Sequence, residues 1–240
     1  MTSTTATFPI SERLKEKFMN KKFRLSKELT FLLAIIIMPF SIAIMTKANF
    51  GLSMIAAPTY IISEKVSFLT YGQTEYIVQT LVLILMCLAV GKFRLSYLTS
   101  FITAIIYGSI LDFFIWCIRD WQLEAIWMRA LIFVLGMVLT SLGVALFMNT
   151  YLAPCAYDYF VRTVVEEKKL DLRKFKLAFD GVFLAISIAL TLILFHKFIG
   201  VTWGTLIIAV CNGNIIAFFN KQMQKHIDFF TRFENLEKIF

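Results

Sequence analysis

The sequence has few charged residues and few of the side chains that build catalytic centres. Charged residues make up 17% of its 240 residues, and it contains two histidines and four cysteines. The cysteines lie far apart, no CxxC pair occurs, and no His, Cys and Asp residues cluster at metal-binding spacing. A phosphate-binding glycine loop of the GxxxxGK[ST] type is also missing. We therefore expect neither an enzyme nor a bound cofactor or metal.

Hydrophobic residues are the main component of the chain. They account for 59%, whereas an ordinary soluble domain is about 45–50% apolar and about 25% charged. A soluble fold of this length could not bury so much apolar surface, so the sequence predicts a protein that lies in a lipid bilayer. The net charge is +8, but the basic residues follow the ends of apolar segments, which argues against nucleic-acid binding.

Six apolar segments contain no Asp, Glu, Lys or Arg. A helix that crosses a bilayer needs roughly 17–25 residues. Most Lys and Arg residues lie before the first segment, after the sixth, or in the connections on that same side. The positive-inside rule then predicts a multi-pass protein of the plasma membrane with both termini in the cytoplasm. The six segments are 29–46, 76–91, 95–111, 130–157, 181–195 and 198–220.

Four further segments flank or interrupt these predicted spans. Residues 1–28 and 221–240 mix basic, acidic and aromatic side chains, and we expect each to form a cytoplasmic amphipathic segment. Residues 50–62 and 152–165 are apolar but too short to cross alone. They are expected to form short helices that either re-enter the membrane or lie on its surface.

The chain aligns with itself at an offset that places Glu75 on Asp180 and Gly108 on Gly213. The pattern predicts two membrane repeats, 29–118 and 127–220, each with three spans and one short helix. Because three is an odd number, the second repeat must enter the membrane from the opposite side. The predicted fold is therefore an all-α membrane protein of six transmembrane helices in two inverted repeats, a plan common among transporters.

The segments that follow the first span of each repeat resemble a known pattern. The first reads Ala48-Asn49-Phe50-Gly51-Leu52-Ser53, and the second reads Leu152-Ala153-Pro154-Cys155-Ala156-Tyr157-Asp158. Together with Trp203-Gly204-Thr205 and Gly213, they resemble the YczE/YyaS/YitT group of small bacterial membrane proteins. The resemblance covers about residues 30–220 and implies a fold and a membrane location, but no particular activity. Ala56 stands where the pattern has an Asp, which weakens any mechanism that needs symmetric carboxylates.

The candidate binding residues begin with acids inside or beside the spans, where a charge is costly. Asp158 lies in the second short segment, next to Tyr157, and could face a cavity that takes a proton, a cation or an amine. Asp112 follows Gly108 by one turn, and its alternative is an interface residue paired with Arg119. Asp180 and its counterpart Glu75 stand before apolar segments, where the expected role is helix capping.

Amide side chains supply the remaining candidates. Asn212 and Asn214 flank Gly213 deep in the sixth apolar segment, and Asn149 could join the same polar interior. Buried amides need hydrogen-bond partners, so they could bind a solute or hold helices together.

Two functions are consistent with these features. The first is a small secondary transporter or permease for a small solute, which would bind to Asp158, Asp112, Asn212, Asn214, Tyr157 and Asn149. The alternative is a non-transporting accessory or regulatory protein that binds a cytoplasmic or membrane partner through Lys168, Lys169, Arg173 and Lys174. The lipid bilayer is the one certain partner, and self-association stays open.

Overall fold

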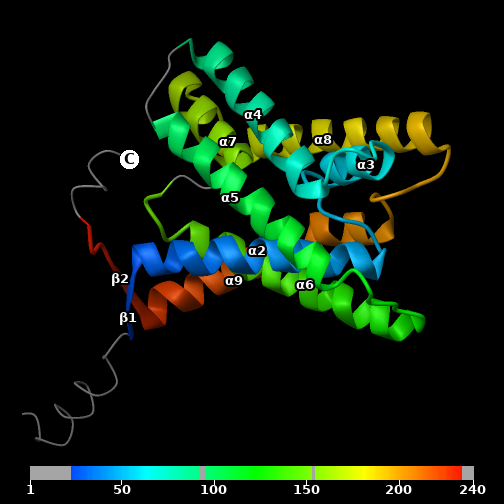
Figure 1. Ribbon diagram of the computed structural model, residues 1–240. Coiled ribbons are helices and arrows are strands. Elements are labelled where there is room, and N and C mark those ends of the chain that lie inside the picture. Colours follow the sequence, from blue (N-terminus) through cyan, green and yellow to red (C-terminus); the bar gives the residue numbers. More distant parts are fainter. Residues whose placement is uncertain (1–22, 92–95, 153–154, 234–240) are drawn as a thin grey trace, which may run out of the picture.

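The computed structural model describes residues 23–91, 96–152 and 155–233 (Figure 1). Within them, eight helices are accompanied by one pair of short strands. In chain order the elements are β1 (Phe23–Ser26), α2 (Lys27–Ala48), α3 (Ala57–Lys65), α4 (Tyr71–Val90), α5 (Ser96–Cys117), α6 (Ile126–Phe147), α7 (Ala156–Lys168), α8 (Leu172–Phe195), α9 (Trp203–His226) and β2 (Ile227–Phe230).

Six of the helices are long and apolar enough to cross a membrane, as the sequence predicts. These are α2, α4, α5, α6, α8 and α9, and the helices have 20–24 residues each. At 1.5 Å per residue they extend about 30–36 Å, which matches the hydrocarbon thickness of a bilayer. The chain is therefore a multi-pass membrane protein.

Capping side chains, not hydropathy, set the ends of these helices. Helix α4 begins five residues before its predicted segment, because the Thr70 hydroxyl accepts from the backbone N–H of Gln73 and the Gln73 side chain accepts in return from Thr70. Asp171 starts α8 in a similar way by accepting from the backbone N–H of Lys174 at 2.8 Å. The prediction that the fourth span continues to residue 157 is wrong, since α6 ends at Phe147.

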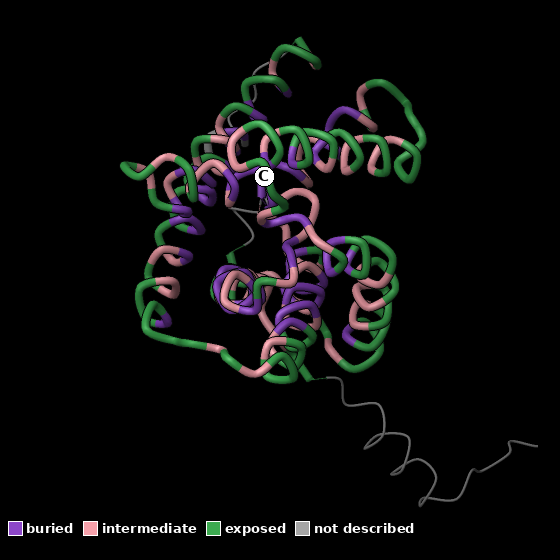
Figure 2. Tube along the Cα trace, turned by 90° about the vertical axis from the view of Figure 1, so that its right-hand side faces the viewer, coloured by how far each residue is buried: buried purple, intermediate pink, exposed green. Residues whose placement is uncertain are grey.

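The outer faces of the long helices are exposed and apolar. Leu85 and Leu88 on α4, Leu131 on α6, Ile193 on α8 and Val210 on α9 are all exposed. Figure 2 shows buried segments facing the middle of the molecule and exposed segments around them. An apolar exterior of this kind fits contact with lipid and would be unfavourable in water.

The centre of the fold is the packing of α2 against α6. Gly136 and Gly143 of α6 let the side chains of Met45 and Met38 approach the α6 backbone, and a methyl group on either glycine would overlap them. A hydrogen bond of 2.8 Å joins the hydroxyls of Ser41 and Thr140 across the same interface.

The flanking segments form a short parallel sheet. Strand β1 pairs with β2, with Phe23 opposite Ile227 and Ser26 opposite Phe230. Residues 23–26 and 227–230 of the predicted amphipathic segments are therefore strand. Residues 1–22 and 234–240 lie outside the described residues. The sheet places the start of α2 and the end of α9 at the same end of the molecule, as an even number of spans requires.

The two short helices begin later than their predicted segments. Both follow non-helical backbone, 49–56 before α3 and 148–155 before α7, of which residues 153–154 are not described. Helix α3 packs against α4 and α8, and α7 packs against α4, α5 and α8. This arrangement brings the starts of both short helices toward the middle of the fold.

Candidate functional site

A cavity of about 320 Å³ lies where the two halves of the chain meet. It is lined by α2, by residues 53–56 in front of α3, and by residues of α4 to α9. Much of its wall is apolar, from Met38 and Ile42 to Ile216. The titratable oxygen- and nitrogen-bearing side chains in its lining are Glu75, Tyr107, Tyr157, Asp158, Lys176 and Asp180.

Glu75 is the most deeply buried carboxylate among them. It is 4% exposed, and its Oε1 accepts a hydrogen bond of 3.2 Å from Gln79 Nε2. Gln79 is fully buried, and its Oε1 accepts from the backbone N–H of Ala156 at the start of α7, at 3.0 Å. Because that N–H can only donate, it fixes the orientation of the Gln79 amide and turns Nε2 toward Glu75. The other oxygen of Glu75, Oε2, is buried without a hydrogen-bond partner among the described residues.

This position corrects the expectation that Glu75 caps a helix. Thr70 caps α4, so Glu75 lies more than one turn inside the helix. A charged side chain within a transmembrane helix costs about 2.5–3.5 kcal/mol on insertion scales, and such residues commonly mark functional sites.

Tyr157 lies close to Glu75 from the side of α7. Its hydroxyl is buried and has no hydrogen-bond partner among the described residues. Burial, together with the nearby charge of Glu75, raises the pKa of Tyr157 well above its usual range. The hydroxyl therefore keeps its proton. Burial also raises the pKa of the neighbouring Cys155 thiol, which argues against a reactive thiolate.

Asp158 lies in the first turn of α7 and lines the cavity. Lys176 Nζ on α8 lies 3.1 Å from Asp158 Oδ1 and 3.4 Å from Asp180 Oδ1. One ammonium thus bridges two carboxylates and links α7 to α8. Asp180, like Glu75, lies well inside its helix, because Asp171 is the cap of α8.

Asn212 also lines the cavity, whereas Asn214 does not. The Oδ1 of Asn212 accepts from the Ser141 hydroxyl at 2.5 Å, which joins α9 to α6. Asn214 is exposed on α9. Asn149 lies at the end of α6, where it donates to the backbone oxygen of Ala145 and to Asn220 Oδ1, both at 2.8 Å.

Asp112 holds two helices together outside the cavity. Its Oδ1 accepts from the backbone N–H of Gly72 at 2.7 Å, and its Oδ2 accepts from the Thr70 hydroxyl at 2.5 Å. The alternative pairing of Asp112 with Arg119 is wrong, since Arg119 contacts Asp120 at 3.3 Å.

Of the six candidate residues, the structure brings Asp158, Tyr157 and Asn212 together at the cavity and leaves Asp112, Asn214 and Asn149 outside it. Sequence reasoning favoured helix capping over binding for Glu75 and Asp180, and it did not name Lys176 as a binding residue. The Thr70-x-x-Gln73 capping box was a signal that could have placed Glu75 inside the span. In the described part of the chain, no group of three His, Cys, Asp or Glu side chains is arranged to hold a metal ion.

Comparisons with known proteins assign the chain to a family. A family model described as a family of unknown function, DUF6198, matches residues 25–221. The chain belongs to this family. Among curated proteins it is similar to the "Uncharacterized protein YyaS" of Bacillus subtilis (strain 168), with 25% identity over 195 residues, covering 81% of this chain and 92% of that protein. No solved structure matches the chain.

Proposed function

We propose that this member of the DUF6198 family is a small secondary transporter or permease for a small solute. The central cavity carries the proposal, because it joins both halves of the chain and brings three carboxylates and one ammonium together among the six candidate membrane helices. Ligand pockets for small organic molecules measure about 300–1,000 Å³, and the volume of about 320 Å³ falls at the lower end of that range.

An inverted relation between the halves would supply alternating access, and the contacts of α2 with α6 support it. Arg129, near the start of α6, donates to the backbone oxygen of Ala48 at the end of α2, at 2.8 Å. At the opposite ends of the two helices, the rings of Phe31 and Phe147 pack with centroids 5.5 Å apart. The first helices of the two halves therefore lie antiparallel.

The remaining contacts largely repeat between the halves. Helix α2 packs on α5 as α6 packs on α9, and α3 packs on α8 as α7 packs on α4. The close pairing of α4 with α5 has no counterpart of similar extent between α8 and α9. Each short helix thus packs on a long helix of the other half, around the cavity, as interrupted helices do in transporters built from inverted repeats.

Transport can be tested in proteoliposomes by solid-supported-membrane recording with a panel of amines, amino acids and sugars. We expect a current for at least one solute with the natural chain and none for Asp158→Asn, which removes a charge from the cavity wall. Asp120→Asn is the matched control, since the Asp120 side chain is 87% exposed. Equal currents for Asp158→Asn and the natural chain would count against the proposed path.

Cysteine labelling tests the inverted arrangement. In a background without native cysteines, Lys65→Cys at the end of α3 and Lys169→Cys after α7 should react with an impermeant reagent from opposite sides of the membrane. We place both termini and Lys169 in the cytoplasm. Labelling of both cysteines from one side would exclude inverted repeats.

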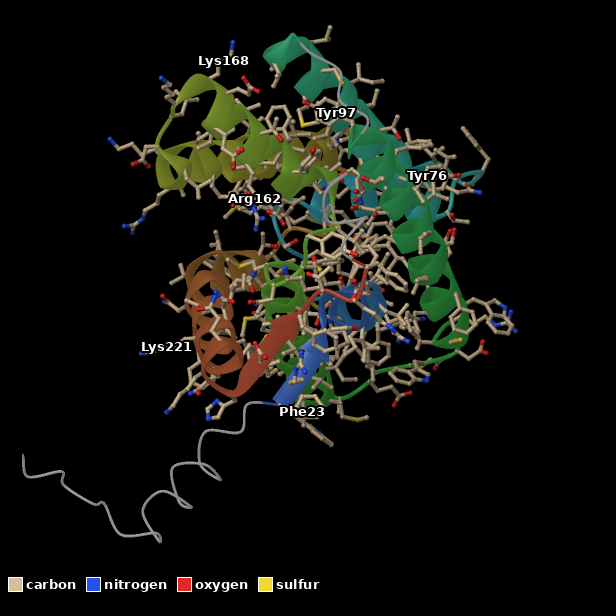
Figure 3. All side chains as sticks on the ribbon, turned by 90° about the vertical axis from the view of Figure 1, so that its left-hand side faces the viewer. Phe23, Tyr76, Tyr97, Arg162, Lys168 and Lys221 are labelled. Carbon is tan, nitrogen blue, oxygen red and sulfur yellow. The ribbon has the colours of Figure 1, made fainter. Side chains whose placement is uncertain are left out.

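The exposed basic residues of the α7–α8 connection favour a second candidate, an accessory protein that binds a partner. Lys168, Lys169, Arg173 and Lys174 are all exposed. Figure 3 views the end of the molecule where Phe23 lies and shows Arg162 and Lys168 on α7 and Lys221 on α9. A partner recovered in equal amount from membranes, and lost when these four residues become Glu, would favour this role. So would the absence of a current for every solute in the panel.

A further inference from the structure

Two buried polar groups on residues of the cavity wall, one on Glu75 and one on Tyr157, are not fully hydrogen-bonded. Oε2 of Glu75 and the hydroxyl of Tyr157 are both buried, and neither makes a hydrogen bond of standard geometry to a described residue, although the Tyr157 hydroxyl lies beside the Glu75 carboxylate. Each side chain belongs to a residue that is 4% exposed, and both line the cavity. Buried polar groups are nearly always satisfied, so an unsatisfied pair on two residues that line a cavity favours a ligand that the two groups bind.

The charges of the lining determine the sign of that ligand. Among the described lining residues, Glu75, Asp158 and Asp180 are acidic and Lys176 alone is basic. Lys176 Nζ is already within 3.4 Å of both aspartates. No basic side chain of the lining is therefore left to neutralise Glu75, and a cation would be favoured over an anion.

The surroundings of Glu75 favour an organic cation over a metal ion. Ca²⁺ and Mg²⁺ need about six oxygen ligands, whereas one carboxylate oxygen and one hydroxyl are free here. The cavity wall also carries the rings of Tyr107 and Tyr157 and the side chains of Met38 and Ile42. Aromatic rings bind ammonium groups through cation–π interactions, and apolar walls bind carbon chains.

We propose that the cavity binds a small protonated amine whose ammonium group donates to Glu75 Oε2 and lies against Tyr157. Gln79 holds the carboxylate from its other oxygen, so the orientation of Glu75 is set before a ligand enters. This inference rests on the proposed function and names its substrate class.

The test measures ligand binding and does not depend on transport. The full chain in lipid nanodiscs is titrated by calorimetry with three probes of different charge: benzylamine, benzyl alcohol and benzoate. Methylamine and putrescine extend the amine series in size. We expect at least one amine to bind, benzyl alcohol to bind at least tenfold more weakly than benzylamine, and benzoate not to bind.

Two variants locate the site. Glu75→Gln keeps an oxygen that can accept from Gln79, so it should fold, and it should weaken amine binding at least tenfold. Tyr157→Phe keeps the ring and removes the hydroxyl, and it should weaken binding severalfold. Glu124→Gln is the matched control, because Glu124 is exposed outside the cavity, and it should bind as the natural chain does.

Each outcome is decisive for the site. No binding by any of the three amines, equal amine affinity in the natural chain and Glu75→Gln, or equal affinity for benzylamine and benzyl alcohol would overturn the inference. Amine binding that depends on Glu75, without any flux in proteoliposomes, would refute transport and leave the site standing. Flux of an uncharged solute that is unchanged in Glu75→Gln would support transport and refute the amine site.

Discussion

Substitution of Gly108 by alanine tests the tightest helix crossing in the fold. Gly108 of α5 meets Gly72 of α4, and a methyl group on Gly108 would lie 2.5 Å from the backbone oxygen of Gly72 and 3.1 Å from its carbonyl carbon. Non-bonded heavy atoms prefer separations of about 3.5–4.0 Å, so the two helices would have to move apart by roughly 1 Å.

That movement would also stretch the hydrogen bonds that fasten Asp112 to α4. Asp112 Oδ1 accepts from the Gly72 N–H at 2.7 Å, and Oδ2 accepts from the Thr70 hydroxyl at 2.5 Å. Overpacking of this kind costs about 1–3 kcal/mol, and hydrogen bonds to a charged group contribute about 1.5–3 kcal/mol when intact. Alanine returns about 1 kcal/mol through its higher helix propensity. We expect Gly108→Ala to lower the free energy of unfolding by about 2 kcal/mol.

Gly213→Ala is the matched control, because Gly213 is the counterpart of Gly108 in the predicted repeat. A methyl group there would meet no atom within 4 Å. It should leave stability unchanged or raise it by up to about 1 kcal/mol. The measurement is the unfolding temperature and the denaturant midpoint of both variants in one detergent. Equal stability of Gly108→Ala and the natural chain would refute the reasoning about the crossing.

Two further substitutions probe the cavity wall. Lys176→Gln leaves Asp158 and Asp180 repelling each other, and since these side chains are 26–37% exposed, we expect a loss of about 1 kcal/mol in the free energy of unfolding. Lys174→Gln is the control and should cause no loss, because Lys174 is exposed. Equal melting curves for the two variants would contradict the ion-pair bridge. Ser141→Ala removes the donor to Asn212 and should lower the free energy of unfolding by about 0.6–1.7 kcal/mol, the usual contribution of an interhelical hydrogen bond in a membrane. Asn214→Ala is the control and should have little effect. A larger loss of stability in Asn214→Ala than in Ser141→Ala would show that Asn212 finds another partner.

The number of spans could be predicted because the hydropathy of a long segment shows directly whether it can lie in lipid. Helix α2 overlaps its predicted segment closely, since an apolar run of the right length has few alternatives in lipid. The short strands at 23–26 and 227–230 gave no comparable signal. Each has four residues, and their pairing joins positions about two hundred residues apart, which local periodicity does not reveal.

The cavity could be predicted only in part, because its members come from seven helices and two non-helical segments. Asp158 and Asn212 stood out as polar residues in apolar surroundings, and both line the cavity. Asp112 stood out for the same reason, yet it fastens α4 to α5. Composition shows that a buried polar group needs a partner, but only packing decides whether that partner is another helix or a space for a ligand.

The misplacement of Glu75 shows how a helix boundary changes a functional prediction. An apolar segment was taken to start at residue 76, so an acid at 75 read as a cap that interacts with the helix dipole. Thr70 and Gln73 instead form the capping box, and the helix continues past Glu75, with Tyr71 and Gln79 buried one turn before and one turn after it. Asp180 also lies inside its helix and not at its start, because it follows the Asp171 cap of α8 by more than two turns. Once the caps are assigned first, both acids become interior residues, and a charge there needs an opposite charge nearby. Lys176 supplies that charge for Asp180, whereas Glu75 has the neutral Gln79 as its hydrogen-bond partner and one oxygen without a partner among the described residues.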